Sequence, residues 1–147
     1  MTALPASCVV DASVGVARMF DEPLSDASRR MFGAAADGAC ACEVHELFYL
    51  ECASAARKHV LRGRFTALEV VDRYASLLEQ PLRLYEVLGL SAATLSQSLG
   101  RGISAYGASY VVLARHLKVP LITADERLVR SMEGMPVEVV RLADIDV

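Results

Sequence analysis

Residues 119–128 read VPLITADERL, a short apolar run that ends in a polar turn and continues into a helical pattern. The run Val119–Thr123 predicts a buried strand, and Asp125 predicts the N-cap of the helix that follows. A similar run near the start of the chain, Cys8–Val10, ends at Asp11. Two acidic residues therefore stand directly after predicted strands, which is where ligands bind in open parallel α/β sheets.

Strand and helix patterns alternate along the rest of the chain. The expected strands are Cys8–Val10, Leu82–Val87, Val119–Thr123 and Val137–Leu142, while Ala39–Val44 fits either a short strand or a loop. The expected helices are Val14–Phe20, Leu24–Ala36, His45–Leu61, Thr66–Glu79, Ser91–Leu99, Ser104–Leu117 and Asp125–Met132. Such alternation predicts a parallel sheet with helices on both faces. No linker or repeat interrupts it, so we expect a single domain over residues 1–147.

Composition and charge restrict the class of protein. Hydrophobic residues make up 54% and charged residues 22% of the chain, which indicates a packed core and excludes global disorder. The longest stretch without a charged residue has 14 residues, whereas a membrane span needs about 20. The first basic residue is Arg18, and Asp11 interrupts the apolar start, so a secretory signal is not expected. We therefore expect a cytoplasmic protein without a membrane segment.

The four cysteines are expected to be free thiols that pack as small apolar side chains in a reducing compartment. They are Cys8, Cys40, Cys42 and Cys52. Cys40, Cys42 and His45 have a spacing that would suit part of a zinc site. No second Cys or His pair follows, and a structural zinc site takes four ligands, so we do not expect zinc here.

Three carboxylates are candidates for chemistry: Asp11, Glu51 and Asp125. Glu51 lies in an apolar stretch of a predicted helix, where a carboxylate is rare unless it is paired or bound to a metal. Each carboxylate also fits a purely structural role. Asp11 and Asp125 could cap helices, and Glu51 could form an ion pair with Lys58. If the three gather, each pair at about 4 Å costs on the order of 4 kcal/mol. A divalent cation would offset this repulsion, and oxygen ligands suit Mg²⁺ or Mn²⁺.

Three segments in this order resemble the PIN domain, and most closely the VapC-type toxins of toxin–antitoxin pairs. They are Cys8–Ser13, Leu50–Ala55 and Leu121–Leu128, and the resemblance spans nearly the whole chain. It implies a three-layer α/β/α sandwich with a mainly parallel central sheet. It also implies an endoribonuclease that depends on Mg²⁺ or Mn²⁺, a homodimer, and a cognate antitoxin that blocks the site.

The resemblance also implies roles for individual residues. The catalytic and metal-binding carboxylates of the family fall on Asp11, Glu51 and Asp125, and its supporting hydroxyls fall on Ser13 and Thr123. With these residues the chain would cleave RNA at a metal centre. The alternative is a PIN-like protein that binds a partner or RNA without catalysis.

The chain departs from the family pattern at Gly107, where an Asp normally follows the tyrosine that is Tyr106 here. Glycine in a helix costs about 0.5–1 kcal/mol relative to alanine, and the first helical turn favours Asp by about 0.3–1 kcal/mol. Three explanations are open: a naturally weakened nuclease, replacement of the missing ligand by Glu126 or Ser104, or an acquired single-base substitution. We expect a metal to bind the remaining carboxylates more weakly.

Four basic residues cluster near the end of the predicted helix that carries Glu51 and in the loop after it: Arg57, Lys58, Arg62 and Arg64. A helix C-terminus favours cations, which accounts for such a cluster without any function. The functional alternative is a rim that contacts RNA phosphates and guides the strand to the carboxylates. Because the net charge is −3, binding of RNA would have to rely on a local patch of this kind.

Overall fold

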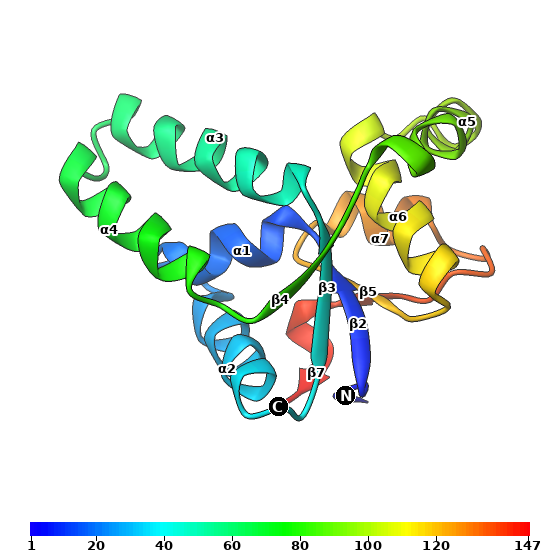
Figure 1. Cartoon of the computed structure of the whole chain (residues 1–147), viewed down its shortest axis with the longest axis horizontal. Coiled ribbons are helices and arrows are strands. Elements are labelled where there is room, and N and C mark those ends of the chain that lie inside the picture. The colour runs from blue at the N-terminus through cyan, green and yellow to red at the C-terminus, as the bar shows by residue number, and fades with distance from the viewer.

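The computed structural model describes residues 1–147 and contains a five-stranded parallel sheet between two layers of helices (Figure 1). The strands lie in the order β4-β3-β2-β5-β6, and every pairing is parallel. Their bounds are β2 Ser7–Val10, β3 Ala41–His45, β4 Leu82–Tyr85, β5 Leu121–Thr123 and β6 Val139–Arg141. The expected three-layer α/β/α architecture with a parallel sheet is confirmed.

The helices divide between the two faces of the sheet. One layer contains α1 to α4, which pack mainly on one another around α1, and the other contains α5 to α7, in which α6 packs on β2, β3 and β5 (Figure 1). Their bounds are α1 Ala12–Met19, α2 Ser25–Ala36, α3 Leu47–Leu61, α4 Ala67–Leu78, α5 Ser91–Arg101, α6 Ala105–Leu117 and α7 Glu126–Ser131. The longest has 15 residues, and none is both long and apolar enough to span a membrane.

Short elements complete the chain. Two-residue strands near the termini, β1 (Thr2–Ala3) and β7 (Ile145–Asp146), form a separate parallel pair. Two 3₁₀ turns, η1 (Leu88–Leu90) and η2 (Leu142–Asp144), precede α5 and β7. None of these four was expected from the sequence, because elements of two or three residues carry no periodic pattern.

Several helix boundaries follow from local capping. Thr66 and Ser104, the first residues of two expected helices, cap α4 and α6 through their side chains. Ser91 begins a third expected helix, where a serine favours a cap; it is instead the first residue of α5, and its hydroxyl donates to the carbonyl of Leu88. The helix expected from His45 begins later, at residue 47, because His45 pairs as the last residue of β3.

The two central strands bring the candidate site together. β2 and β5 are buried between the helical layers, which explains why both read as continuous apolar runs. They pair in parallel with Val10 opposite Ile122. The next residues, Asp11 and Thr123, therefore meet at the carboxyl edge of the sheet.

Helices α1 and α3 approach closely at Gly15. A Cβ atom on this residue would lie 2.6 Å from Cζ of Phe48 and 2.8 Å from Sγ of Cys52, so only glycine permits the contact. The approach matters for the site because α1 follows Asp11 directly, whereas α3 carries Glu51.

Candidate active site

The centre of the candidate site is the buried carboxylate of Asp11, which is 6% exposed at the end of β2. Its Oδ2 accepts a hydrogen bond of 2.6 Å from Oγ1 of Thr123, and its Oδ1 accepts from both the hydroxyl and the backbone N–H of Ser13. Ser13 and Thr123 are themselves 3.2 Å apart between hydroxyl oxygens. The structure thus brings the predicted Asp and both predicted hydroxyls into one network.

Asp125 stands next to this network, at the start of α7. Its backbone N–H donates to Oγ1 of Thr123 at 3.0 Å. Its Oδ1 accepts from the backbone N–H groups of Arg127 and Leu128 at 2.9 and 3.4 Å, so the side chain caps α7. The structural role expected for Asp125 is therefore present, and the side chain is still 44% exposed. A cap of this kind leaves Oδ2 free for another ligand.

Glu51 lies half-buried in the first half of α3, and its partner is a tyrosine. The hydroxyl of Tyr110, on α6, donates to Oε1 of Glu51 at 2.8 Å. The ion pair with Lys58 that the sequence allowed does not form. Tyr110 is 1% exposed and was not identified from the sequence as a site residue, because a buried tyrosine at helical spacing indicates only a core position.

The ring of Tyr110 stacks on buried His45, with ring centroids 4.1 Å apart. Nδ1 of His45 accepts from the backbone N–H of Leu47 at 3.2 Å, so Nε2 carries the hydrogen and donates to the hydroxyl of Ser109 at 2.7 Å. Burial lowers the pKa of His45 to about 4. His45 is therefore a neutral residue that fixes the ring of Tyr110 and hence the hydroxyl that holds Glu51.

The three carboxylates influence one another's charge. Burial raises the pKa of Asp11 to about 6, its hydroxyl hydrogen bonds oppose the rise, and the negative charge of Asp125 adds to it. Burial also raises the pKa of Glu51 to about 7; the hydrogen bond from Tyr110 opposes this rise and the charge of Asp11 adds to it. Burial is the largest cause of both shifts, and repulsion from a neighbouring carboxylate is the smallest.

The oxygens of the three carboxylates do not converge on one point. Asp11, Glu51 and Asp125 do not form a group whose ligand atoms all lie within 4.8 Å of one another. Their chemistry nevertheless fits a divalent cation, because the donors are carboxylate and hydroxyl oxygens, which Mg²⁺ and Mn²⁺ prefer. Side-chain rotation of Glu51 and Asp125 would be needed to bring all three onto one ion.

Gly107 lies where the resemblance placed it, in the first turn of α6, and its N–H donates to Oγ of Ser104 at 3.0 Å. It shares a cavity of about 560 Å³ with Asp125. A Cβ atom on Gly107 would meet only Oγ of Ser104 at 3.4 Å and Cδ1 of Leu128 at 3.6 Å, which are ordinary contacts. The fold therefore has room for the side chain of an aspartate at position 107, in the cavity that Asp125 also lines.

Both oxygens considered as a replacement for that ligand already have other partners. Oγ of Ser104 is occupied as the helix cap. Glu126 is 55% exposed, and its Oε2 lies 3.8 Å from Nη1 of Arg141, in an ion pair at the surface. The geometry gives no support to replacement by either residue.

The cysteines group differently from the Cys–His spacing in the sequence. Cys8, Cys40 and Cys42 have sulfur atoms within 4.8 Å of one another, and all are buried. His45 does not join them, because both of its ring nitrogens are hydrogen-bonded elsewhere. Cys8 was missed as a member because it lies far away in sequence and reaches the others only through β-sheet pairing.

The basic cluster is exposed and free of ion pairs. Arg57 and Lys58 lie on the last turns of α3, and Arg62 and Arg64 follow the helix; all four are exposed, and none pairs with a carboxylate. At about 1.5 Å per residue, Lys58 stands roughly 10 Å along the helix from Glu51. The cluster thus begins about two helical turns from Glu51 and continues to the far end of α3.

No family model matches the sequence, and no curated protein matches it significantly. Solved structures do match the fold. PAE2754 from Pyrobaculum aerophilum has a TM-score of 0.71 at 20% sequence identity, over 97% of this chain and 93% of that chain. The fold is PIN-like. A toxin–antitoxin complex from Klebsiella pneumoniae contains a chain with a TM-score of 0.57 at 12% identity, over 92% of this chain and 97% of that chain.

Proposed function

We propose that this chain is a metal-dependent endoribonuclease, the toxin of a toxin–antitoxin pair, weakened by glycine at position 107. One observation carries the proposal. The carboxylate of Asp11 is buried at the carboxyl edge of a parallel sheet and oriented by two hydroxyls; the charge of Asp125 raises its pKa, and its own charge raises that of Glu51. Such an arrangement raises the energy of the protein by itself, and a divalent cation offsets it.

Asp11, Glu51 and Asp125 would hold the ion, which when bound activates water and stabilises charge at the scissile phosphate. The chain's own residues prepare the site for it. Ser13 and Thr123 orient the carboxylate of Asp11, and Tyr110 orients that of Glu51. With a pKa of about 7, Glu51 keeps a proton in part of the metal-free molecules at neutral pH, which further weakens binding of the ion.

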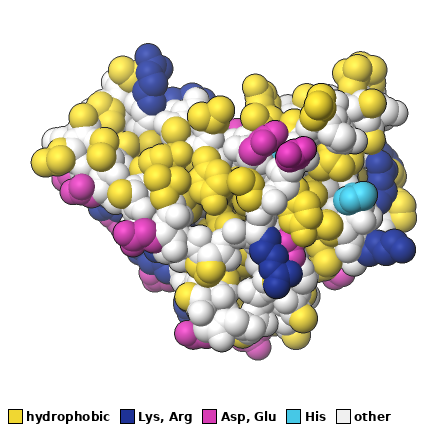
Figure 2. Space-filling view, in the orientation of Figure 1, with side chains coloured by type: hydrophobic (Ala, Val, Ile, Leu, Met, Phe, Trp, Pro, Cys, Tyr) yellow, Lys and Arg dark blue, Asp and Glu magenta, His cyan; other side chains and the backbone are white.

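We propose that Arg57, Lys58, Arg62 and Arg64 contact the RNA backbone. Their side chains are exposed and not neutralised by acidic neighbours, so they can exchange counterions for phosphates. In the view of Figure 2, Lys and Arg side chains lie in the region of α3. Charge reversal at Arg62 would weaken RNA binding and reduce its salt dependence, without changing the affinity for the ion.

A protein partner is supported by the apolar surface. Three large side chains on α4 are exposed, Leu68 at 72%, Val71 at 61% and Leu78 at 53%, and Figure 2 shows further apolar side chains over the face formed by α3, α4 and β4. Contiguous apolar surface of this extent is typical of interaction sites. Since the Klebsiella neighbour is a toxin–antitoxin complex, we propose that a cognate antitoxin covers α4.

A homodimer through α5 is the second association that we propose. Leu95 and Leu99 are 58% and 77% exposed on α5, four residues apart on one face, and Tyr106 beside them on α6 is 59% exposed. A matched pair of variants, Leu95→Glu and Leu68→Glu, separates the two surfaces. The first would convert a dimer to a monomer in light scattering, and the second would leave the mass unchanged.

The alternative, a PIN-like protein that binds without catalysis, is favoured by Gly107 and by the separation of the carboxylates. An RNA cleavage assay distinguishes the two. The purified chain would be incubated with structured RNA and Mn²⁺, with Asp11→Asn as the matched variant, because Asn preserves the α1 cap. We expect slow cleavage by the native chain and none by the variant. Equal cleavage by the native chain and by Asp11→Asn would show that the activity comes from a contaminating nuclease. That result would support a protein that binds without catalysis.

A further inference from the structure

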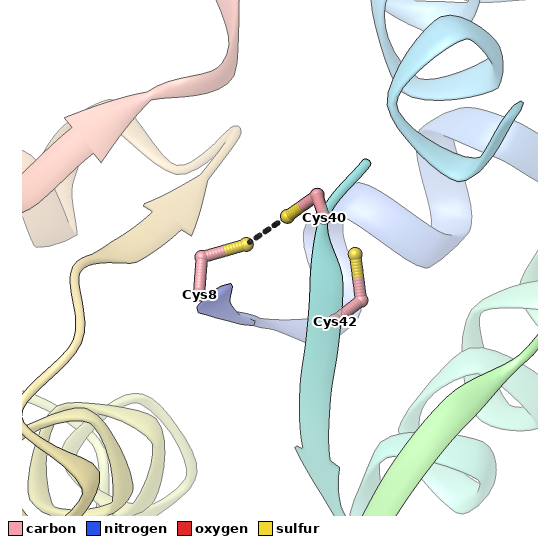
Figure 3. A group of neighbouring side chains, drawn as sticks. All are labelled: Cys8, Cys40 and Cys42. Carbon is pink, nitrogen blue, oxygen red and sulfur yellow. Dashed lines mark hydrogen bonds between the residues drawn. The ribbon is translucent and has the colours of Figure 1, made fainter. Parts of the chain in front are cut away.

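Three cysteine sulfurs meet at the amino-terminal side of the sheet, away from the candidate active site (Figure 3). Cys8 on β2 is the direct Cα partner of Cys42 on β3. Cys40, two residues before Cys42, faces the same side of the sheet, and its Sγ lies 3.6 Å from that of Cys8. Figure 3 shows the three sulfur atoms directed toward one another.

This group offers only sulfur ligands and is almost completely shielded from solvent. The exposed fractions are 0% for Cys8, 2% for Cys40 and 1% for Cys42, and no His, Asp or Glu joins the group. The only donors are therefore three sulfur atoms. An exposed turn, residues 37–39, lies immediately before Cys40.

We propose that Cys8, Cys40 and Cys42 form a binding site for Cu(I). Thiolates select Cu(I) and zinc among biological cations, and coordination number decides between these two. Zinc in a structural site takes four ligands, whereas monovalent Cu(I) is satisfied by two or three sulfurs. Three sulfurs within 4.8 Å, with no fourth protein ligand, match the lower number.

The three sulfur atoms influence one another's protonation. Interaction with its two neighbours lowers the pKa of Cys40, whereas the pKa values of Cys8 and Cys42 are raised. Cys40 is therefore the thiol of the group that loses its proton most easily. Cu(I) binding would displace a proton from at least one of the other two thiols, with no change in oxidation state.

The copper site and the carboxylate site would be chemically independent. Cys8 lies three residues before Asp11 along β2, a separation of about 10 Å in an extended strand. One site offers only sulfur and the other only oxygen, so each selects a different class of ion. Failure of the ribonuclease proposal would therefore leave this inference untouched.

The test is an anaerobic titration of the reduced full chain with Cu(I), in competition with the chromophoric chelator bathocuproine disulfonate. We expect one equivalent bound per chain, a thiolate-to-copper absorption band in the ultraviolet, and a raised melting temperature. Cys40→Ala should weaken binding by more than the roughly 10–100-fold typical of losing an outer-shell partner. Cys52→Ala is the matched control, since Cys52 is equally buried and outside the group.

The native chain makes the test decisive even if a variant fails to fold. No copper band with the folded native chain would overturn the proposal and leave the three cysteines as packed core residues. Tighter binding of Zn²⁺ than of Cu(I), or full binding by Cys40→Ala, would overturn it as well. Thermal unfolding of each variant identifies any loss of binding that comes only from loss of structure.

Discussion

The hydroxyl of Tyr110 on α6 donates a hydrogen bond of 2.8 Å to Oε1 of Glu51 on α3. This bond joins the two helical layers at the carboxyl edge of the sheet, where Asp11 also lies. It gives Glu51 a fixed partner in place of a basic residue, and it lowers a pKa that burial and the charge of Asp11 raise. The position of Tyr110 therefore affects both the orientation and the charge of the candidate ligand.

Tyr110→Phe removes this donor while keeping the ring stacked on His45. We expect the pKa of Glu51 to rise above about 7, and the free energy of unfolding to fall by about 1 kcal/mol. The pKa is measured by carbon NMR of the carboxyl group. Tyr74→Phe is the control, because that hydroxyl donates to a backbone carbonyl. A pKa of Glu51 that stays constant in Tyr110→Phe would show that the bond is absent in solution.

Gly107→Asp should restore a ligand. The site has room for the side chain, so we expect faster Mn²⁺-dependent RNA cleavage, and the aspartate in the first turn of α6 adds about 0.3–1 kcal/mol through the helix dipole. Gly107→Asn and Gly107→Ala share the gain in helix propensity but bring no charge. Cleavage rates of the three variants decide the matter. Equal rates for the Asp and Asn variants would contradict a ligand role at this position.

The close approach of α1 and α3 predicts that even a methyl group at position 15 would destabilise the fold. Gly15→Ala places a methyl group against Phe48 and Cys52, and such overpacking destabilises by about 1–3 kcal/mol. Gly33→Ala, at an exposed position of α2 with nothing within 4 Å of the added Cβ, should instead stabilise by about 0.5–1 kcal/mol. Urea unfolding measures both. Similar effects of the two substitutions would mean that the helices are farther apart than described.

His45 predicts a pH dependence of stability. Its pKa is lowered by burial from 6.5 to about 4, so between these values the unfolded chain binds a proton that the folded chain does not. Stability is therefore full above pH 6.5 and falls as the pH drops, by up to about 3 kcal/mol. The His45→Gln variant should not show this loss of stability at low pH. The free energy of unfolding of the native chain and of His45→Gln is compared from pH 7 to 4.5, because the opposite contributions of Asp11 and Glu51 to stability are the same in both chains. Parallel curves of stability against pH would contradict a buried, neutral His45.

Sequence patterns were sufficient for four of the five sheet strands and for the residues at the ends of β2 and β5, whereas β3 was left open between a strand and a loop. β2 and β5 are buried on both faces and leave continuous apolar runs, so the positions of Asp11 and Thr123 could be predicted. Tyr110 and Cys8 could not, because their partners are distant in sequence and are brought near only by packing and strand register. The separation of the three carboxylates also depends on side-chain rotamers, which the sequence does not determine.

The central claim is that Asp11, Glu51 and Asp125 together bind a divalent cation. Calorimetric titration of Mn²⁺ into the native chain, Asp11→Asn, Glu51→Gln and Asp125→Asn tests it most directly, because Asn preserves both helix caps. We expect saturable binding by the native chain, and an affinity at least about tenfold weaker, or 1.4 kcal/mol, in each variant. Native affinity in all three variants, or no binding to the native chain, would contradict the claim.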